Sequence, residues 1–85
     1  MLINPQLGMI VKCISSVPYY GELKGCVGPI VRIEKSFDYP IGVIMNDGSR
    51  LGWFLPDELM MEDDPAVVKK EQERRQREAH AEKYL

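Results

Sequence analysis

Residues 40–61 read PIGVIMNDGSRLGWFLPDELMM, and this stretch decides the fold. Its apolar run at residues 41–45 is rich in β-branched side chains and too short for a helix, which favours a strand. Asp47 and Gly48 follow between two apolar runs. This pattern is typical of a tight hairpin turn, because glycine adopts a positive φ without steric cost. We therefore predict a β-hairpin with Gly48 at positive φ and a return strand that ends at Trp53 and Phe54.

A single helical turn should follow the hairpin. Residues 55–59 read LPDEL, in which Pro56 presets φ for the start of a helix and the two leucines lie four residues apart. We expect Asp57 to cap this turn and a last short strand to end near Met61. Hairpin, single turn and short strand together are typical of the end of a small five-stranded barrel.

The chain before the hairpin supplies two more strands. We predict a leader at residues 1–7, a strand at 9–14, a loop at 15–24, a second strand at 25–34 and a loop at 34–39. Gly25, Gly28 and Pro29 interrupt the second strand, which suits a bulge or an edge. Strand alternation and the closing turn predict a core of Val11, Cys13, Ile30, Ile33, Val43, Met45, Phe54 and Leu59.

The composition changes near Asp64, an expected N-cap that precedes Pro65 at the first helical position. Residues 66–85 contain no glycine or proline and are dense in helix formers. Its apolar positions cluster at the two ends and its middle has no apolar stripe, so we predict a solvated helix that is largely independent of barrel folding and has only its ends available for docking. The predicted organisation is a leader (1–7), a barrel (8–63) and a charged C-terminal helix (64–85).

The 85 residues make one small domain with a formal net charge of −2. Residues 1–63 carry five basic and eight acidic side chains, whereas residues 64–85 carry six basic and five acidic ones. The acidic barrel argues against binding of a phosphate backbone to its surface, since that affinity comes from Lys and Arg. The start shows no signal-peptide pattern, and no apolar run approaches the roughly 20 residues of a membrane span. We expect a cytoplasmic protein without a membrane partner.

No pattern of catalytic residues appears. Cys13 and Cys26 are too far apart for a zinc pair, and each lies in a predicted strand, where a free cysteine behaves as a small buried hydrophobe. The single histidine, His80, lies among charges on the C-terminal helix. The acidic clusters at residues 57–58 and 62–64 have no histidine or cysteine partner. We therefore expect no enzymatic activity, metal site or cofactor.

The spacing of glycines and core hydrophobes resembles SH3-like barrels. The pattern consists of Gly8-x-x-Val11-Lys12, Gly25-x-x-Gly28-x-Ile30-Val31-x-Ile33, Ile41-x-Val43, Asp47-Gly48 and Phe54-x-x-x-Glu58-Leu59. Over residues 8–62 it is similar to KOW-type barrels, to the ferredoxin-docking subunit of photosystem I and to the variable chain of ferredoxin–thioredoxin reductase. The resemblance implies a mainly β protein, a five-stranded SH3-like barrel with a C-terminal α-helical tail. The acidic barrel and the charged helix depart from the photosystem type.

Aromatic side chains in the loops are the first candidate site. In SH3-like barrels the corresponding loops form the ligand groove, and aromatics supply contact area at low entropy cost. The predicted partner-binding residues are Tyr19, Tyr20, Phe37 and Trp53. The alternative is that Phe37, Tyr39 and Phe54 plug the ends of the barrel. The expected function is a non-enzymatic protein-interaction module, a small adaptor, regulator or inhibitor of a larger cytoplasmic assembly, of a size that fits a phage-encoded protein.

A basic segment of the C-terminal helix is the second candidate site. Its members are Lys69, Lys70, Arg74, Arg75 and Arg77. They would suit a KOW-type role in binding nucleic acid or the ribosome. Interspersed glutamates dilute this charge, and an ordinary soluble helix surface has the same pattern.

Overall fold

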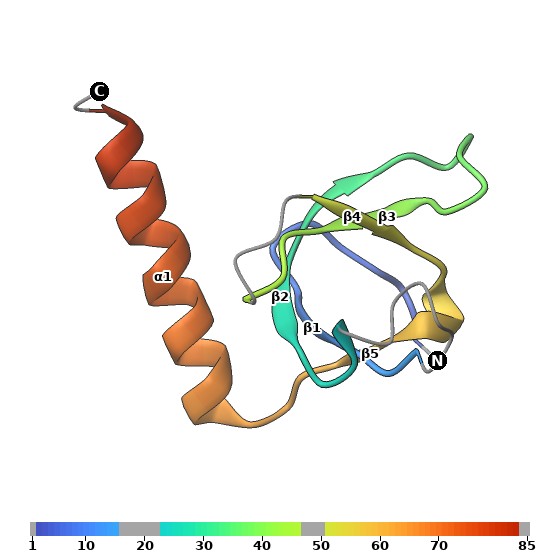
Figure 1. Ribbon diagram of the computed structural model, residues 1–85, viewed down its shortest axis with the longest axis horizontal. Helices are drawn as coiled ribbons and strands as arrows, with labels where there is room; N and C mark the ends of the chain where they lie inside the picture. Colours follow the sequence, from blue (N-terminus) through green and yellow to red (C-terminus); the bar gives the residue numbers. More distant parts are fainter. Residues whose placement is uncertain (1, 16–22, 47–50, 84–85) are drawn as a thin grey trace.

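The computed structural model describes residues 2–15, 23–46 and 51–83, with side chains up to Arg74. The protein is mainly β, with one five-stranded antiparallel sheet followed by one helix (Figure 1). The elements are β1 (Ile10–Cys13), β2 (Val27–Ile33), β3 (Ile41–Val43), β4 (Gly52–Phe54), the 3-10 turn η2 (Pro56–Glu58), β5 (Leu59–Met61) and α1 (Pro65–Lys83). The strand order is β4-β3-β2-β1-β5, and the sheet is open because β4 and β5 are not paired with each other.

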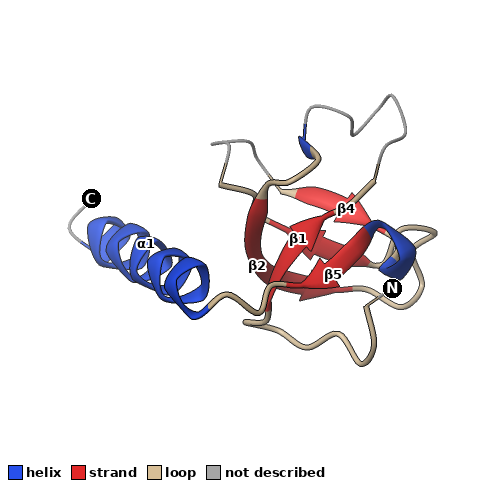
Figure 2. Cartoon of the chain, turned by 90° about the horizontal axis from the view of Figure 1, so that it is seen from below, coloured by secondary structure: helices blue, strands red, loops and turns tan. Residues whose placement is uncertain are grey.

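Strand β2 is the central strand and pairs with both halves of the sheet. Its first half pairs with β1, where Lys12 opposes Val27, and its second half pairs with β3, where Ile33 opposes Ile41. The register shifts near Ile30 in the β2–β3 ladder. Such an irregularity bends a strand and increases its twist. The sheet therefore curves around β2, so that β1 and β5 face β3 and β4 across the interior (Figure 2).

Of the two alternatives predicted for the second strand, the bulge is confirmed and the edge is wrong, because β2 is the central strand of the sheet; it begins at Val27 and not at Gly25. Gly25 has a φ of 90°, and its N–H donates to the Cys13 carbonyl at 2.8 Å. The Cys13 N–H donates to the carbonyl of the next residue, Cys26, at 2.9 Å. Two residues thus oppose one, which is a bulge that needs glycine at its first position.

The interior is filled by the residues that strand alternation selects. Seven of the eight predicted core residues are buried, and Ile33 packs against the cluster while partly exposed. The sequence missed Leu2 and Ile41, which are 5% and 1% exposed. The leader packs on the sheet, since the Leu2 N–H donates to the Pro56 carbonyl at 3.0 Å. Neither Cys13 nor Cys26 forms a disulfide, and burial raises the pKa of the Cys13 thiol.

The hairpin and the turn after it form largely as expected. Strands β3 and β4 pair antiparallel, with Ile41 opposite Phe54, while the predicted turn at Asp47 and Gly48 lies outside the described residues. The short turn is η2, and β5 follows it directly. Its cap differs from the expectation: the Leu55 N–H donates to Glu58 Oε1 at 2.8 Å, so Glu58 and not Asp57 satisfies the free donor.

Helix α1 begins as predicted. The Asp64 carboxylate accepts a hydrogen bond from the Ala66 N–H at 3.0 Å, which makes it the N-cap, and Pro65 is the first helical residue. The prediction of a fully solvated middle is wrong, because Glu71 is only 2% exposed and α1 contacts β2. Glu71 is paired within the helix with Arg74, at 2.7 Å, and the Arg74 guanidinium also reaches the Ile44 carbonyl at 3.4 Å.

The contact between α1 and β2 explains a second buried layer. Ile10 and Val27 are buried but lie outside the interior cluster. Because successive strand residues point to opposite faces, they point away from the side that Val11 occupies. Figure 1 shows α1 alongside β2 on this outer side, where Val67 and Val68 are half-buried.

Candidate functional site

The loop between β2 and β3 carries the first half of the candidate site. The Glu34 N–H donates to the Pro40 carbonyl at 2.8 Å and closes the loop, and the Phe37 N–H donates to the Glu34 carbonyl at 2.9 Å. These bonds set the position of Phe37. Its ring contacts that of Trp53 on β4, with the ring centroids 4.9 Å apart and the planes tilted by 59°. Two of the four predicted aromatic residues are therefore brought together.

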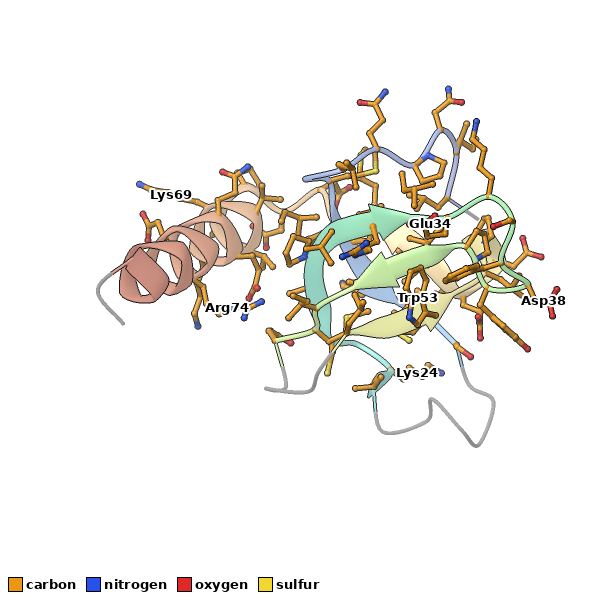
Figure 3. All side chains as sticks on the ribbon, turned by 90° about the horizontal axis from the view of Figure 1, so that it is seen from above. Lys24, Glu34, Asp38, Trp53, Lys69 and Arg74 are labelled. Atoms are coloured by element: carbon orange, nitrogen blue, oxygen red, sulfur yellow. The ribbon has the colours of Figure 1, made fainter. Side chains whose placement is uncertain are left out.

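Gly42 on β3 explains why the Trp53 ring can lie across the sheet. Gly42 pairs with Trp53 in the β3–β4 ladder. A Cβ atom at Gly42 would lie 3.1 Å from the Arg32 and Leu51 side chains and 3.3 Å from the Trp53 ring. Side chains from β2, from β4 and from the residue before β4 thus converge over a position that has no side chain of its own. We call Arg32, Phe37, Leu51 and Trp53 the Trp53 surface; Figure 3 shows Trp53 beside the strands, with Asp38 farther out on the loop.

The Trp53 surface is accessible. Phe37 is 50% exposed, Leu51 is 37% exposed and Trp53 is half-buried. Arg32 stands at the rim, with a guanidinium nitrogen 3.9 Å from the Glu34 carboxylate. The alternative that Phe37 and Tyr39 plug the end of the sheet is wrong, because both are about half exposed; Phe54 alone of the three is buried.

The remaining aromatic candidates, Tyr19 and Tyr20, lie outside the described residues. Sequence reasoning missed Arg32 and Leu51. Strand alternation predicts that the Arg32 side chain of β2 points away from the interior, but it does not predict which side chains lie next to it. The position of Leu51 next to Gly42 follows from the register between β3 and β4.

A groove of about 460 Å³ opens beside the same loop. Three segments far apart in the sequence line it: the leader, the ends of the β2–β3 loop, and η2. The lining residues are Asn4, Pro5, Gln6, Ile33, Lys35, Pro40, Ile41 and Pro56. No signal in the sequence indicates that these segments meet.

The basic segment of α1 is not a free row of cations. Lys69 and Lys70 are exposed. Arg74 instead binds Glu71 and the Ile44 carbonyl, and its side chain is only 25% exposed. The side chains of Arg75 and Arg77 lie outside the described residues. Nucleic-acid binding through this helix stays a prediction, and one of its five proposed cations is already engaged within the chain.

A second buried carboxylate joins the sheet to the start of α1. Glu62 lies 3.2 Å from Lys12 on β1 and accepts a hydrogen bond from the Asp64 N–H at 3.1 Å. The backbone hydrogen bond from Asp64 lowers the pKa of Glu62, and Lys12 lowers it further, against the opposing effect of burial. These interactions hold the segment between β5 and α1 against β1, which is a structural role for Glu62.

Within the described part of the chain, no group of three histidine, cysteine or acidic side chains is arranged to hold a metal ion. Over the same residues, the structure contains no helix with the length and apolar character needed to cross a membrane. Comparison of the sequence with protein-family models and with curated proteins finds no match.

Proposed function

We propose that this protein is a non-enzymatic protein-interaction module that binds its partner through the Trp53 surface. The observation that carries the proposal is the contact between the exposed Phe37 ring and the half-buried Trp53 ring, whose centroids are 4.9 Å apart. Aromatic and arginine side chains dominate binding energy at protein interfaces; the aromatics bury much area for few rotatable bonds, and arginine adds several hydrogen-bond donors. Arg32 and Leu51 add a cationic rim and an aliphatic contact beside the rings.

We further propose that the sheet is an SH3-like barrel. The strand order β4-β3-β2-β1-β5 supports this, because β2 takes part in both halves of the sheet and bends where its partner changes. The 3-10 turn between β4 and β5 supports it as well, since it carries the chain from one half to the other. In such a barrel the β2–β3 loop and β4 present their side chains to a ligand at one side.

The geometry also supports a preformed surface. Two backbone hydrogen bonds hold the loop at Glu34, and Trp53 is held in the ladder opposite Gly42. A surface that is already ordered loses less conformational freedom on binding, so more of its contact energy appears as affinity. A small adaptor or inhibitor would need this property, because its contact area is limited.

Binding measurements on single variants test the proposal. Affinity capture with the full chain, followed by mass spectrometry, supplies a partner, and calorimetry then measures its affinity for the native chain and for Phe37→Ala. We expect at least tenfold weaker binding, because truncation of an aromatic hot-spot residue typically costs about 2 kcal/mol or more, and about 1.4 kcal/mol corresponds to a factor of ten. The melting temperature should change little, since half of the Phe37 side chain is already in contact with water.

The matched control is Met61→Ala on β5. Met61 is 54% exposed and lies on the strand at the opposite end of the sheet from β4. Its truncation removes a similar exposed apolar side chain and should leave the affinity unchanged. Equal affinities of the native chain and Phe37→Ala for the captured partner would refute the proposal.

A further inference from the structure

The groove beside the β2–β3 loop has an apolar floor and stiff walls. Ile33 and Ile41 are opposed in the β2–β3 ladder and form the floor, while Pro5, Pro40 and Pro56 stand around it. Proline has no backbone N–H, so these walls offer no hydrogen-bond donor of their own. The volume of about 460 Å³ lies within the range of small-ligand pockets and has room for one aliphatic side chain and its backbone.

Three of the backbone carbonyls around the groove, those of Gln6, Pro40 and Pro56, already accept hydrogen bonds within the chain. The Pro40 carbonyl accepts the Glu34 N–H at 2.8 Å, and the Gln6 carbonyl accepts the Met9 N–H at 3.1 Å. The Pro56 carbonyl accepts the N–H groups of Leu2 and Leu59. Hydrogen bonding to a ligand therefore falls mainly to side chains at the rim: the amides of Asn4 and Gln6, and the ammonium group of Lys35.

Lys35 gives the groove its charge. It is the one charged side chain among the lining residues, and it is exposed. The neighbouring carboxylate, Glu34, is paired with Arg32. Lys35 makes no ion pair with any other residue described by the structure. An ammonium group beside an apolar floor is complementary to a carboxylate that is followed or preceded by an aliphatic side chain.

We propose that this groove binds an extended segment of the partner protein in which a leucine-like side chain is next to an acidic residue. The aliphatic side chain occupies the space over Ile33 and Ile41, and the carboxylate pairs with Lys35. The inference rests on the proposed function, since it names the chemistry of the segment that the partner presents. Lys35 and Phe37 are two residues apart on one loop, so a single partner can contact the groove and the Trp53 surface together.

Methyl NMR of the full chain with labelled isoleucine tests the assignment. The probes are three short peptides: Ac-Leu-Glu-NH2, its neutral isostere Ac-Leu-Gln-NH2, and Ac-Ser-Glu-NH2, which lacks the aliphatic side chain. We expect saturable shifts of the Ile33 and Ile41 methyl groups with Ac-Leu-Glu-NH2, in the millimolar range, and no shift of Ile14. The neutral peptide should bind about two- to fivefold more weakly, the range that exposed ion pairs give. Ac-Ser-Glu-NH2 should produce no saturable shift.

Two lysine variants test whether the charge of Lys35 causes the preference for the acidic peptide. Lys35→Gln should abolish the difference between the two leucine peptides and leave the affinity for Ac-Leu-Gln-NH2 unchanged. The control Lys24→Gln removes an exposed lysine that does not line the groove and should preserve the difference. The difference should also narrow at high salt, because screening weakens exposed ion pairs.

The inference is overturned if the native chain binds both leucine peptides equally, if the difference survives in Lys35→Gln, or if no saturable shift appears at Ile33 and Ile41. Its failure is distinguishable from failure of the proposed function. If Phe37→Ala loses partner binding but the peptides produce no saturable shift, the Trp53 surface remains the proposed binding site and only the assignment of the groove is rejected.

Discussion

Gly28 lies in β2 where the chain beyond β3 passes directly against it. An alanine Cβ at this position would collide with the carbonyl oxygen of Ile44, and it would stand 2.8 Å from the Ile44 carbonyl carbon and 3.0 Å from the Met45 Cα. All three are backbone atoms, so no side-chain rotation relieves the clash. Gly28→Ala must therefore move the segment that follows β3 away from β2.

The hydrogen bonds that this movement breaks set the size of the effect. They include the bond from the Asn46 N–H to the Val27 carbonyl at 2.7 Å, the return bond from the Val27 N–H to Asn46 Oδ1 at 3.2 Å, and the Ile44–Pro29 backbone bond at 3.3 Å. Each contributes about 0.5–1.5 kcal/mol. Overpacking adds about 1–3 kcal/mol. The lower limits of these contributions together set a loss of at least about 2.5 kcal/mol, which is half or more of the stability of roughly 5 kcal/mol of so small a domain.

Urea denaturation followed by Trp53 fluorescence measures this loss, with Gly8→Ala as the control. Gly8 has a φ of 87°, but nothing lies within 4 Å of its Cβ position. That variant carries only the strain of a side chain at positive φ, about 1–2 kcal/mol. If Gly28→Ala costs no more than Gly8→Ala, then the close approach of Ile44 does not constrain β2 and our account of the sheet is wrong.

Three further predictions concern the helix and its junction with the sheet. Because hydrogen bonding lowers the pKa of Glu62 below its ordinary value of 4.5, the stabilisation it gives is present above that value and is lost as the pH falls through the folded-state pKa. The stability difference between the native chain and Glu62→Gln in urea melts should therefore shrink from pH 7 towards pH 3; a constant difference would contradict this. Arg74→Gln should lower stability by about 1–2 kcal/mol because it leaves the Glu71 carboxylate buried without its partner, whereas Lys69→Gln should have almost no effect. We expect no measurable RNA or DNA binding near physiological salt; micromolar affinity that is lost when Lys69 and Lys70 are both changed to Gln would favour the nucleic-acid alternative.

Local rules were enough to predict most of the strands and the interior. Alternation placed Val11 and Cys13 on one face, and the closing turn placed Phe54 and Leu59 inside; all four are buried. The N-cap at Asp64 was also predicted correctly, because capping depends on residues that are close together in the chain. These features follow from periodicity and turn chemistry within a few residues.

The sequence determined much less about the surfaces that bind. It selected Phe37 and Trp53 as aromatic loop residues, but their contact required the β3–β4 register and the absence of a side chain at Gly42. It also predicted a solvated helix, because an apolar stripe is the usual sign of docking; α1 nevertheless lies against β2, and the Arg74 guanidinium, paired with Glu71 of the same helix, reaches the Ile44 carbonyl.

Tertiary structure alone decided the groove and the role of Gly28. Pro5, Pro40 and Pro56 are separated by many residues and meet only because the leader returns to η2 and the β2–β3 loop lies beside both. Gly28 reads as an interruption of a strand, yet its function is to admit the backbone of Ile44. In both cases the neighbour that matters is distant in sequence, and only the folded chain brings it within contact distance.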